Sequence, residues 1–161
     1  MYRWIVARIA RWAILSGVNG KPELATRMMA DDVTFEFPGS SSFGASLRGR
    51  DAVLAWLQRF AALSPEYVVR DVVVTGPPWN TRLAVRLSDR IGDDYANEGM
   101  QYLRMRWGKV ISDEVFVDTE KVADLERRHP EIATEATVGR QLPTPLAGNS
   151  PSPARAALAR S

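Results

Sequence analysis

The sequence predicts an α+β fold in which helices come first and long antiparallel strands follow. Three observations support this prediction. Residues 50–63 carry an apolar stripe at helical spacing, the segments after residue 66 alternate apolar and polar side chains, and the connections between these segments are short and rich in Gly and Pro. Helices grouped before strands are typical of an α+β domain, because a parallel α/β sheet would alternate the two. We expect a cone-shaped, curved, mainly antiparallel but mixed sheet wrapped around the N-terminal helices.

The first predicted helix starts at the N-terminus and carries an apolar arc opposite three arginines. The arc consists of Tyr2, Ile5, Val6, Ile9, Trp12 and Ala13. We expect it to pack on the core, whereas Trp4 falls among the arginines and has no evident role. The uncharged run Trp12–Ser16 is too short for a secretory signal, which needs about 7–15 apolar residues, or for a membrane span, which needs about 20. We therefore expect a cytoplasmic protein with no membrane partner.

Two further helices and one strand follow before the main strands. Pro22 opens a short helix that extends to about Met29, since proline favours the first helical position. Residues 33–37 alternate cleanly and predict a strand with Phe37 on its apolar face. Residues 38–47 are rich in Gly and Ser and predict a loop, and residues 50–63 form the clearest helix.

The second half of the domain is predicted as four strands and a last helix. The strands are Tyr67–Thr75, Arg82–Asp89, Tyr95–Arg106 and Val110–Asp118. A helix follows at Thr119–Arg128, with Asp118 as its N-cap. We expect one folded domain over residues 1–130. Residues 131–161 are rich in Pro and Ala and predict a disordered tail.

Composition excludes several classes of site. The chain has no Cys and one His, so disulfide scaffolds, thiolate metal sites and histidine-based hydrolase triads are not expected, and we expect no metal and no cofactor. The formal charge is +2, but residues 139–161 carry three arginines and no acid, so the rest of the chain is slightly acidic. Because a nucleic-acid surface usually shows a basic stripe across the folded body, we expect no nucleic-acid partner.

Four polar side chains interrupt the apolar faces of the predicted strands: Asp89, Asn97, Gln101 and Asp113. Leu103 shares the inward phase of its strand with the two amides. Burying a polar group without a partner costs several kcal/mol, so these groups indicate a pocket. The structural alternatives are a strand end, which fits Asp89, or a bulge that reverses the phase.

Asp113 is the better candidate for proton transfer, because it lies in the middle of its strand among apolar neighbours. Desolvation raises a carboxyl pKa from about 4 toward neutrality, which is the range that a general acid or base needs. Asn97 and Gln101 offer amide donors that could hold a developing oxyanion. Asp89 is a second acid or a strand-end charge.

Several stretches resemble the SnoaL-like branch of the nuclear transport factor two and ketosteroid isomerase superfamily. They are residues 30–38, 48–53, 108–111 and 117–120, and residues 76–81 with 95–99 resemble an actinobacterial subgroup. The resemblance covers about residues 2–127 and implies a cone-shaped α+β barrel, a homodimer and a hydrophobic pocket. Glu98 and Tyr102 face outward and would suit a dimer surface. Trp79 follows two prolines in an exposed turn and has no assigned role.

The resemblance also argues against two of the family's activities. The Tyr, basic Asp and protonated Asp of ketosteroid isomerases would fall on Trp12, Phe37 and Gln101. The Arg-x-Asp and final Asp of epoxide hydrolases would fall on Leu87, Asp89 and Val115, which keeps one carboxylate of the set. Neither set is intact.

Two functions therefore stay open. The first is binding of a small hydrophobic molecule in the cone, with isomerase- or cyclase-type proton transfer by Asp113 and Asp89 on an apolar carbonyl or polyene substrate. Its expected lining residues are Trp12, Phe37, Asn97, Gln101, Leu103 and Val115. The second is a dimeric, non-catalytic binding or structural module whose cone is filled by its own side chains, as the bulky Trp12 and Phe37 suggest. A ligand site should enclose about 300 Å³ or more.

Overall fold

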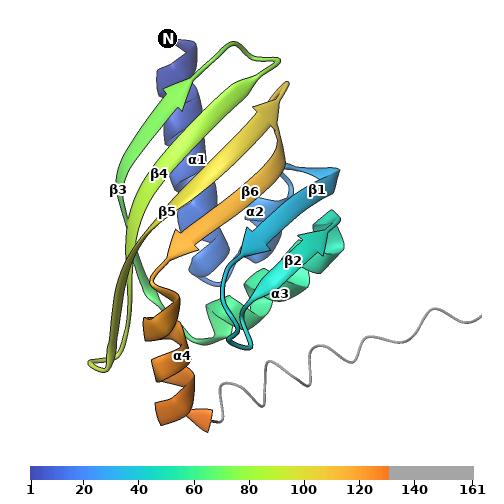
Figure 1. The fold of residues 1–161 in the computed structure, drawn as a ribbon. Coiled ribbons are helices and arrows are strands. Elements are labelled where there is room, and N and C mark those ends of the chain that lie inside the picture. Colours follow the sequence, from blue (N-terminus) through green and yellow to red (C-terminus); the bar gives the residue numbers. More distant parts are fainter. Residues whose placement is uncertain (131–161) are drawn as a thin grey trace, which may run out of the picture.

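The computed structural model describes residues 1–130 and has the expected α+β architecture (Figure 1). The helices are α1 (Tyr2–Val18), α2 (Pro22–Thr26), α3 (Arg50–Ala62) and α4 (Thr119–Arg128). The strands are β1 (Met29–Phe37), β2 (Ala45–Arg48), β3 (Glu66–Thr75), β4 (Thr81–Ile91), β5 (Tyr95–Arg106) and β6 (Lys109–Val117). The expected tail, residues 131–161, lies outside the described residues.

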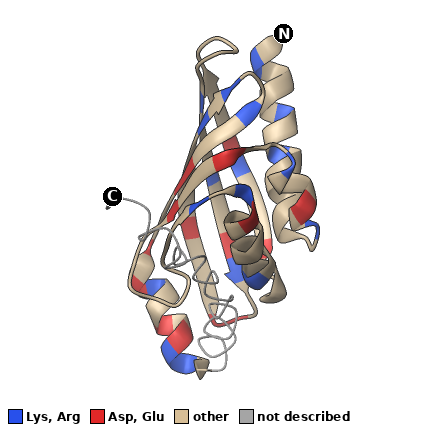
Figure 2. Ribbon diagram, turned by 90° about the vertical axis from the view of Figure 1, so that its right-hand side faces the viewer, with Lys and Arg blue, Asp and Glu red and all other residues tan. Residues whose placement is uncertain are grey.

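One curved, six-stranded sheet carries the fold, in the order β2-β1-β6-β5-β4-β3. All neighbours pair antiparallel except β1 and β6, which are parallel, so the mixed sheet is confirmed. Helices α1, α2 and α3 cover one side of the sheet, and α4 projects from one end (Figures 1 and 2). The arginines of α1 are visible as blue bands in Figure 2.

The structure corrects two predicted segments. Helix α2 ends at Thr26 rather than near Met29, because β1 already begins at Met29. The expected loop at 38–47 contains the start of β2, whose residues pair antiparallel with the end of β1. The Gly- and Ser-rich composition of this stretch hides the strand, because β2 has only four residues and alternates between half-buried and exposed positions.

A bulge changes the phase of β6. The pairing between β5 and β6 shifts between Arg104 and Met105, so that Val110 rather than Ile111 faces the interior. A bulge places one extra residue on one strand and reverses the faces of the residues before it. Asp113 lies beyond the shift and keeps the inward orientation that the sequence predicts.

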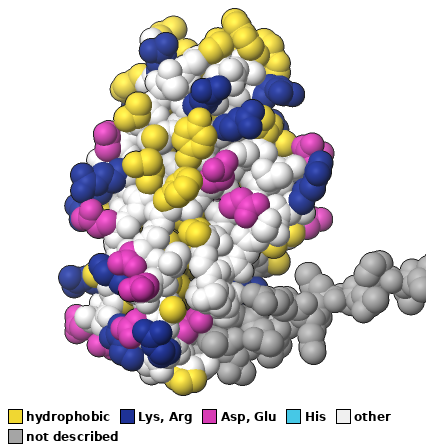
Figure 3. Space-filling view, viewed as in Figure 1, with side chains coloured by type: hydrophobic (Ala, Val, Ile, Leu, Met, Phe, Trp, Pro, Cys, Tyr) yellow, Lys and Arg dark blue, Asp and Glu magenta, His cyan; other side chains and the backbone are white. Residues whose placement is uncertain are grey.

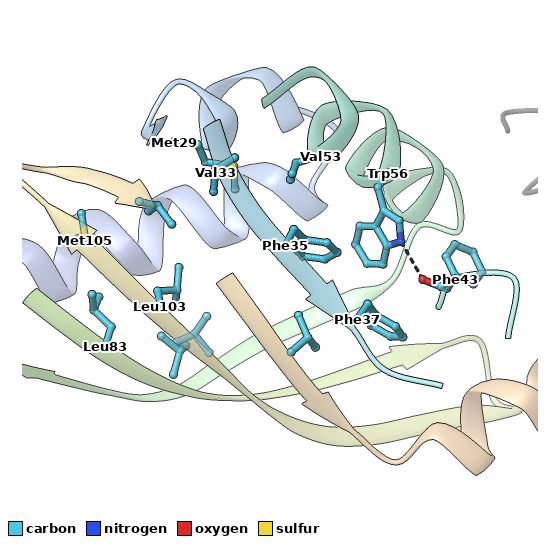
Figure 4. Packing of buried hydrophobic residues seen from close by; sticks show 14 of the residues in the cluster. Met29, Val33, Phe35, Phe37, Phe43, Val53, Trp56, Leu83, Leu103 and Met105 are labelled. Carbon is cyan, nitrogen blue, oxygen red and sulfur yellow. Dashed lines mark hydrogen bonds between the residues drawn. The ribbon is translucent and has the colours of Figure 1, made fainter. Parts of the chain in front are cut away.

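An aromatic cluster closes one side of the core (Figure 4). Trp56 of α3 packs against Phe35 and Phe37, with ring centroids 4.7 and 5.2 Å away, and stacks on Phe60 at 5.3 Å. The indole Nε1 of Trp56 donates to the carbonyl oxygen of Phe43 at 2.9 Å. This hydrogen bond satisfies the one polar atom of a ring that is otherwise buried in apolar surroundings.

Two exposed tryptophans, Trp79 and Trp107, lie in contact at the end of the sheet that carries the β3–β4 and β5–β6 turns. The ring centroids of Trp79 and Trp107 lie 5.9 Å apart, and the backbone N–H of Trp107 donates to the carbonyl oxygen of Pro78 at 2.8 Å. Trp79 therefore helps to join the β3–β4 turn to the β5–β6 turn. On α1, the guanidinium of Arg8 lies 4.7 Å from the Trp4 ring centroid, which is cation–π geometry. No helix between residues 1 and 130 is long and apolar enough to cross a bilayer.

Candidate functional site

A cavity of about 270 Å³ lies inside the cone, between the inner face of the sheet and the helices α1 and α3. Its walls are mainly apolar and aromatic and include Val6, Phe35, Phe37, Trp56, Phe60 and Leu103. The volume is slightly below the usual lower limit of about 300 Å³ for small-molecule sites. The cone is thus partly filled by its own side chains.

Six of the eight predicted site residues line this cavity. They are Phe37, Asp89, Gln101, Leu103, Asp113 and Val115. Strands β1, β4, β5 and β6 bring them together, because inward-facing positions of neighbouring strands lie side by side. In the parallel pair, Asp113 of β6 lies opposite Phe35 of β1.

Trp12 does not line the cavity, which corrects the predicted arc of α1. The helix turns Val6, Ala13 and Gly17 toward the interior, and Trp12 falls at the edge of this stripe, where it is 52% exposed. A helical wheel drawn from the sequence cannot distinguish the centre of an apolar stripe from its edge when both carry large apolar residues. Trp12 therefore does not block the cone.

Asn97 is buried, but its side chain is engaged elsewhere, which corrects its predicted role as an oxyanion donor. Its Nδ2 donates to the Tyr95 hydroxyl and to the carbonyl oxygen of Asp118, both at 3.0 Å. Its Oδ1 accepts from the Glu98 N–H at 3.0 Å. Asn97 thus ties the end of β6 to β5. Asp118 also caps α4 as predicted, since its carboxylate accepts from the N–H groups of Glu120 and Lys121.

Asp89 of β4 is 6% exposed and lines the cavity. Its Oδ1 has no hydrogen-bond partner among the described residues. Burial raises the pKa of the Asp89 carboxyl to about 6. A hydrogen bond from the Tyr95 hydroxyl and the positive charge of Lys121 act in the opposite direction and favour the ionised form.

Asp113 of β6 is 4% exposed and has fewer groups around it that favour its ionised form than Asp89 has. Its Oδ2 accepts from the Gln101 Nε2 at 3.4 Å, and its Oδ1 has no partner within the described part of the chain. Burial raises the pKa of the Asp113 carboxyl to about 7, with a further contribution from the negative charge of Glu114. A carboxyl that titrates near neutrality can both donate and accept a proton at physiological pH.

Tyr67 of β3 lines the same cavity, although it is not among the site residues predicted from the sequence. Burial raises the pKa of the Tyr67 hydroxyl, and the charges of Asp89 and Asp113 raise it further. The hydroxyl therefore stays protonated and is available as a donor near both carboxyls. Its position two residues before the buried Val69 was the available signal, since both share the inward phase of β3.

The charged groups that line the cavity are all acidic. Besides Asp89 and Asp113 they include Glu126 of α4. Its carboxylate accepts from the backbone N–H of Ser42 at 2.8 Å and from the Ser42 hydroxyl. Among the described residues, no Lys, Arg or His lines the cavity, and no cluster of three potential ligands could hold a metal ion. The chemistry that these side chains can perform is proton transfer by carboxyl groups, assisted by a tyrosine hydroxyl.

Known structures share this fold at low sequence identity. A nuclear transport factor two-like protein from Burkholderia xenovorans is 17% identical, with 76% of this chain and 95% of that chain covered and a TM-score of 0.58. A candidate ketosteroid isomerase from Kribbella flavida is 22% identical, with 72% and 79% covered and a TM-score of 0.56. A candidate polyketide cyclase from Pseudomonas putida is 11% identical, with 74% and 96% covered and a TM-score of 0.55. At these identities the likeness shows the fold alone.

A search of curated proteins finds no match to this chain. The model of the SnoaL-like domain, in contrast, matches residues 10–112, which is well over half of the sequence. This range contains β1 to β5 and the helices α2 and α3. The mixed curved sheet is the fold of the solved nuclear transport factor two-like structure, and by the family match the protein belongs to the SnoaL-like domain family.

Proposed function

We propose that the cone binds a small apolar molecule and that the protein is a cofactor-independent isomerase or cyclase. The observation that carries this proposal is Asp113, a carboxyl with one unpaired oxygen that is buried in the wall of an apolar cavity. The raised pKa of Asp113 supports its use as a proton donor and acceptor. The folds shared with a candidate isomerase and a candidate cyclase are consistent with this class of reaction.

In this mechanism the ionised Asp113 removes a proton from a carbon next to a carbonyl group or double bond. The electron pair of the broken C–H bond moves onto the substrate oxygen or along the conjugated system. The Tyr67 hydroxyl donates a hydrogen bond to the developing negative charge. Protonated Asp113 then returns the proton to a second carbon, so no redox partner is needed. Gln101 orients Asp113 through its contact with Oδ2.

We also propose that the protein is a homodimer that associates through the outer face of the sheet. Val68, Val73, Met100 and Phe116 are exposed large apolar side chains on β3, β5 and β6. Figure 3 shows hydrophobic side chains gathered over this face, with charged groups around them. Glu98 lies on the same face and pairs with Arg86 at 3.0 Å. The cytoplasmic location stays a prediction.

A non-catalytic, dimeric module is the second candidate, and the modest volume of the cavity favours it. A thermal-shift screen of small apolar compounds distinguishes the two. The wild type is compared with Leu103→Phe, which fills the cavity, and with Arg104→Phe, which adds the same ring on the opposite face of β5. All three proteins are first checked for cooperative unfolding.

The proposal expects compounds that stabilise the wild type and Arg104→Phe but not Leu103→Phe. If no compound raises the melting temperature of the wild type, or if Leu103→Phe is stabilised as much as the wild type, the cavity is not a ligand site. The non-catalytic, dimeric module is then favoured. For any compound that is turned over, Asp113→Asn should abolish turnover while binding remains. Undiminished turnover by Asp113→Asn would remove Asp113 from the catalytic role.

A further inference from the structure

Three buried oxygen atoms around the cavity lack donors. They are Asp89 Oδ1, Gln101 Oε1 and Asp113 Oδ1, and no described residue donates a hydrogen bond to any of them. All three residues line the cavity. Buried polar atoms in folded proteins are almost always paired, so a group of unpaired acceptors in one cavity needs an explanation. A ligand that brings its own donors would supply one.

The electrostatics of the cavity favour a positively charged donor. Asp89, Asp113 and Glu126 contribute only acidic charge, and the described lining residues include no basic side chain to balance it. The wall also contains the aromatic rings of Trp56 and Tyr67. Aromatic faces attract cations, and the attraction increases when both are removed from water.

The two aspartates have different partners, which divides their roles. Asp89 receives a hydrogen bond from Tyr95, whose hydroxyl in turn accepts from Asn97, and it also feels the charge of Lys121. These groups favour the ionised form of Asp89. Asp113 has only the long contact with Gln101 and the unfavourable charge of Glu114. Asp89 is therefore the better counter-ion and Asp113 the better proton carrier.

We infer that the ligand of the cavity is an apolar amine, whose ammonium group is bound by Asp89 while its hydrocarbon part packs against the aromatic wall. This inference rests on the proposed function and names its substrate class. The ammonium supplies the N–H donors that the unpaired oxygens lack. A ketone without an amino group brings only an acceptor and leaves these oxygens unpaired, and a carboxylate adds a like charge to an acidic cavity.

A series of probes with one hydrocarbon cage and different polar groups tests the inference. The probes are 1-aminoadamantane, 1-adamantanol, 2-adamantanone and adamantane-1-carboxylate, measured by isothermal titration calorimetry on the full chain at neutral pH. We expect the amine to bind at least ~10-fold more tightly than the ketone, and the carboxylate to show no binding. Asp89→Asn should remove the preference for the amine, because it removes the charge that binds the ammonium group. Asp93→Asn, an exposed carboxyl in the β4–β5 turn, is the matched control and should keep the preference.

An NMR titration of the wild type provides a second readout that does not depend on a variant. Saturation with the amine should lower the pKa of the Asp89 carboxyl, whereas the ketone should not. Equal affinities for amine and ketone, or an unchanged Asp89 pKa, would overturn the inference while binding in the cavity stands. If none of the four probes binds, both the inference and the proposed function fail.

Discussion

Replacing Asp113 by asparagine tests whether the buried carboxyl reduces the stability of the fold at neutral pH. Burial raises the pKa of Asp113 from 3.8 to about 7, so the folded protein holds this proton more tightly than the unfolded chain does. Below about pH 4 the carboxyl is protonated in both states and causes no loss. Between about pH 4 and 7 the Asp113 carboxyl is ionised in the unfolded chain but still protonated in the folded protein, so the free energy of unfolding falls with rising pH.

The size of the stability loss follows from the difference between the pKa of Asp113 in the folded and in the unfolded chain. Each unit of pKa difference corresponds to about 1.4 kcal/mol, so a shift of about three units removes about 4 kcal/mol above pH 7. Asparagine cannot ionise but is itself polar and buried, so the net gain for Asp113→Asn should be about 2–4 kcal/mol at pH 8. Asp89, with a pKa of about 6, also lowers the free energy of unfolding as the pH rises, over the narrower pH range from about 4 to 6.

Urea unfolding monitored by tryptophan fluorescence, from pH 3.5 to 8, measures the difference. We expect Asp113→Asn and the wild type to be similar at the acid end and to diverge as pH rises. The exposed control Asp93→Asn should follow the wild type throughout. A constant difference at all pH values, or a variant that is less stable than the wild type at pH 8, would show that Asp113 is not an uncompensated buried acid.

Three further predictions concern the scaffold. In Gly99→Ala the new Cβ would lie 2.7 Å from the carbonyl oxygen of Phe116, so β5 and β6 must separate. We expect the free energy of unfolding, measured by chemical denaturation, to fall by about 1–3 kcal/mol. An unchanged free energy of unfolding would contradict the close packing of these two strands. Phe116→Glu should convert the proposed dimer into a monomer in light scattering, and a dimer that persists would exclude the outer face as the interface. Deletion of residues 139–161 should leave the melting temperature unchanged, whereas a cooperative loss of stability would show that these residues belong to the fold.

Much of the sheet could be predicted because its signals are local. Arginines mark the outward face of β4 and of the end of β5, and the period of two then sets the inward phase of Asp89, Gln101 and Leu103. Helix α4 was predicted at its observed bounds, because Asp118 is a strong N-cap at the end of a strand. These features depend on residues that are close in the sequence.

The errors arise where tertiary contacts decide. Trp12 carries the same apolar signal as Val6, and only the position of α1 on the sheet separates the exposed ring from the buried one. Asn97 has the inward phase of a pocket residue, but its donors are used by Tyr95 and by the Asp118 carbonyl, a partner 21 residues away. Tyr67 gains its place beside two carboxyls only through the pairing of β3 with β4.

The protonation of Asp113 in the ligand-free protein tests the central claim most directly. Carbon-13 NMR of the side-chain carboxyl, assigned by comparison with Asp113→Asn, follows its titration from pH 3 to 9. We expect a midpoint near pH 7, because Asp113 is buried in an apolar cavity wall with one unpaired oxygen. A midpoint near pH 4 would rule out the proposed role of Asp113, because it would show a carboxyl that is solvated or paired and is not prepared for proton transfer.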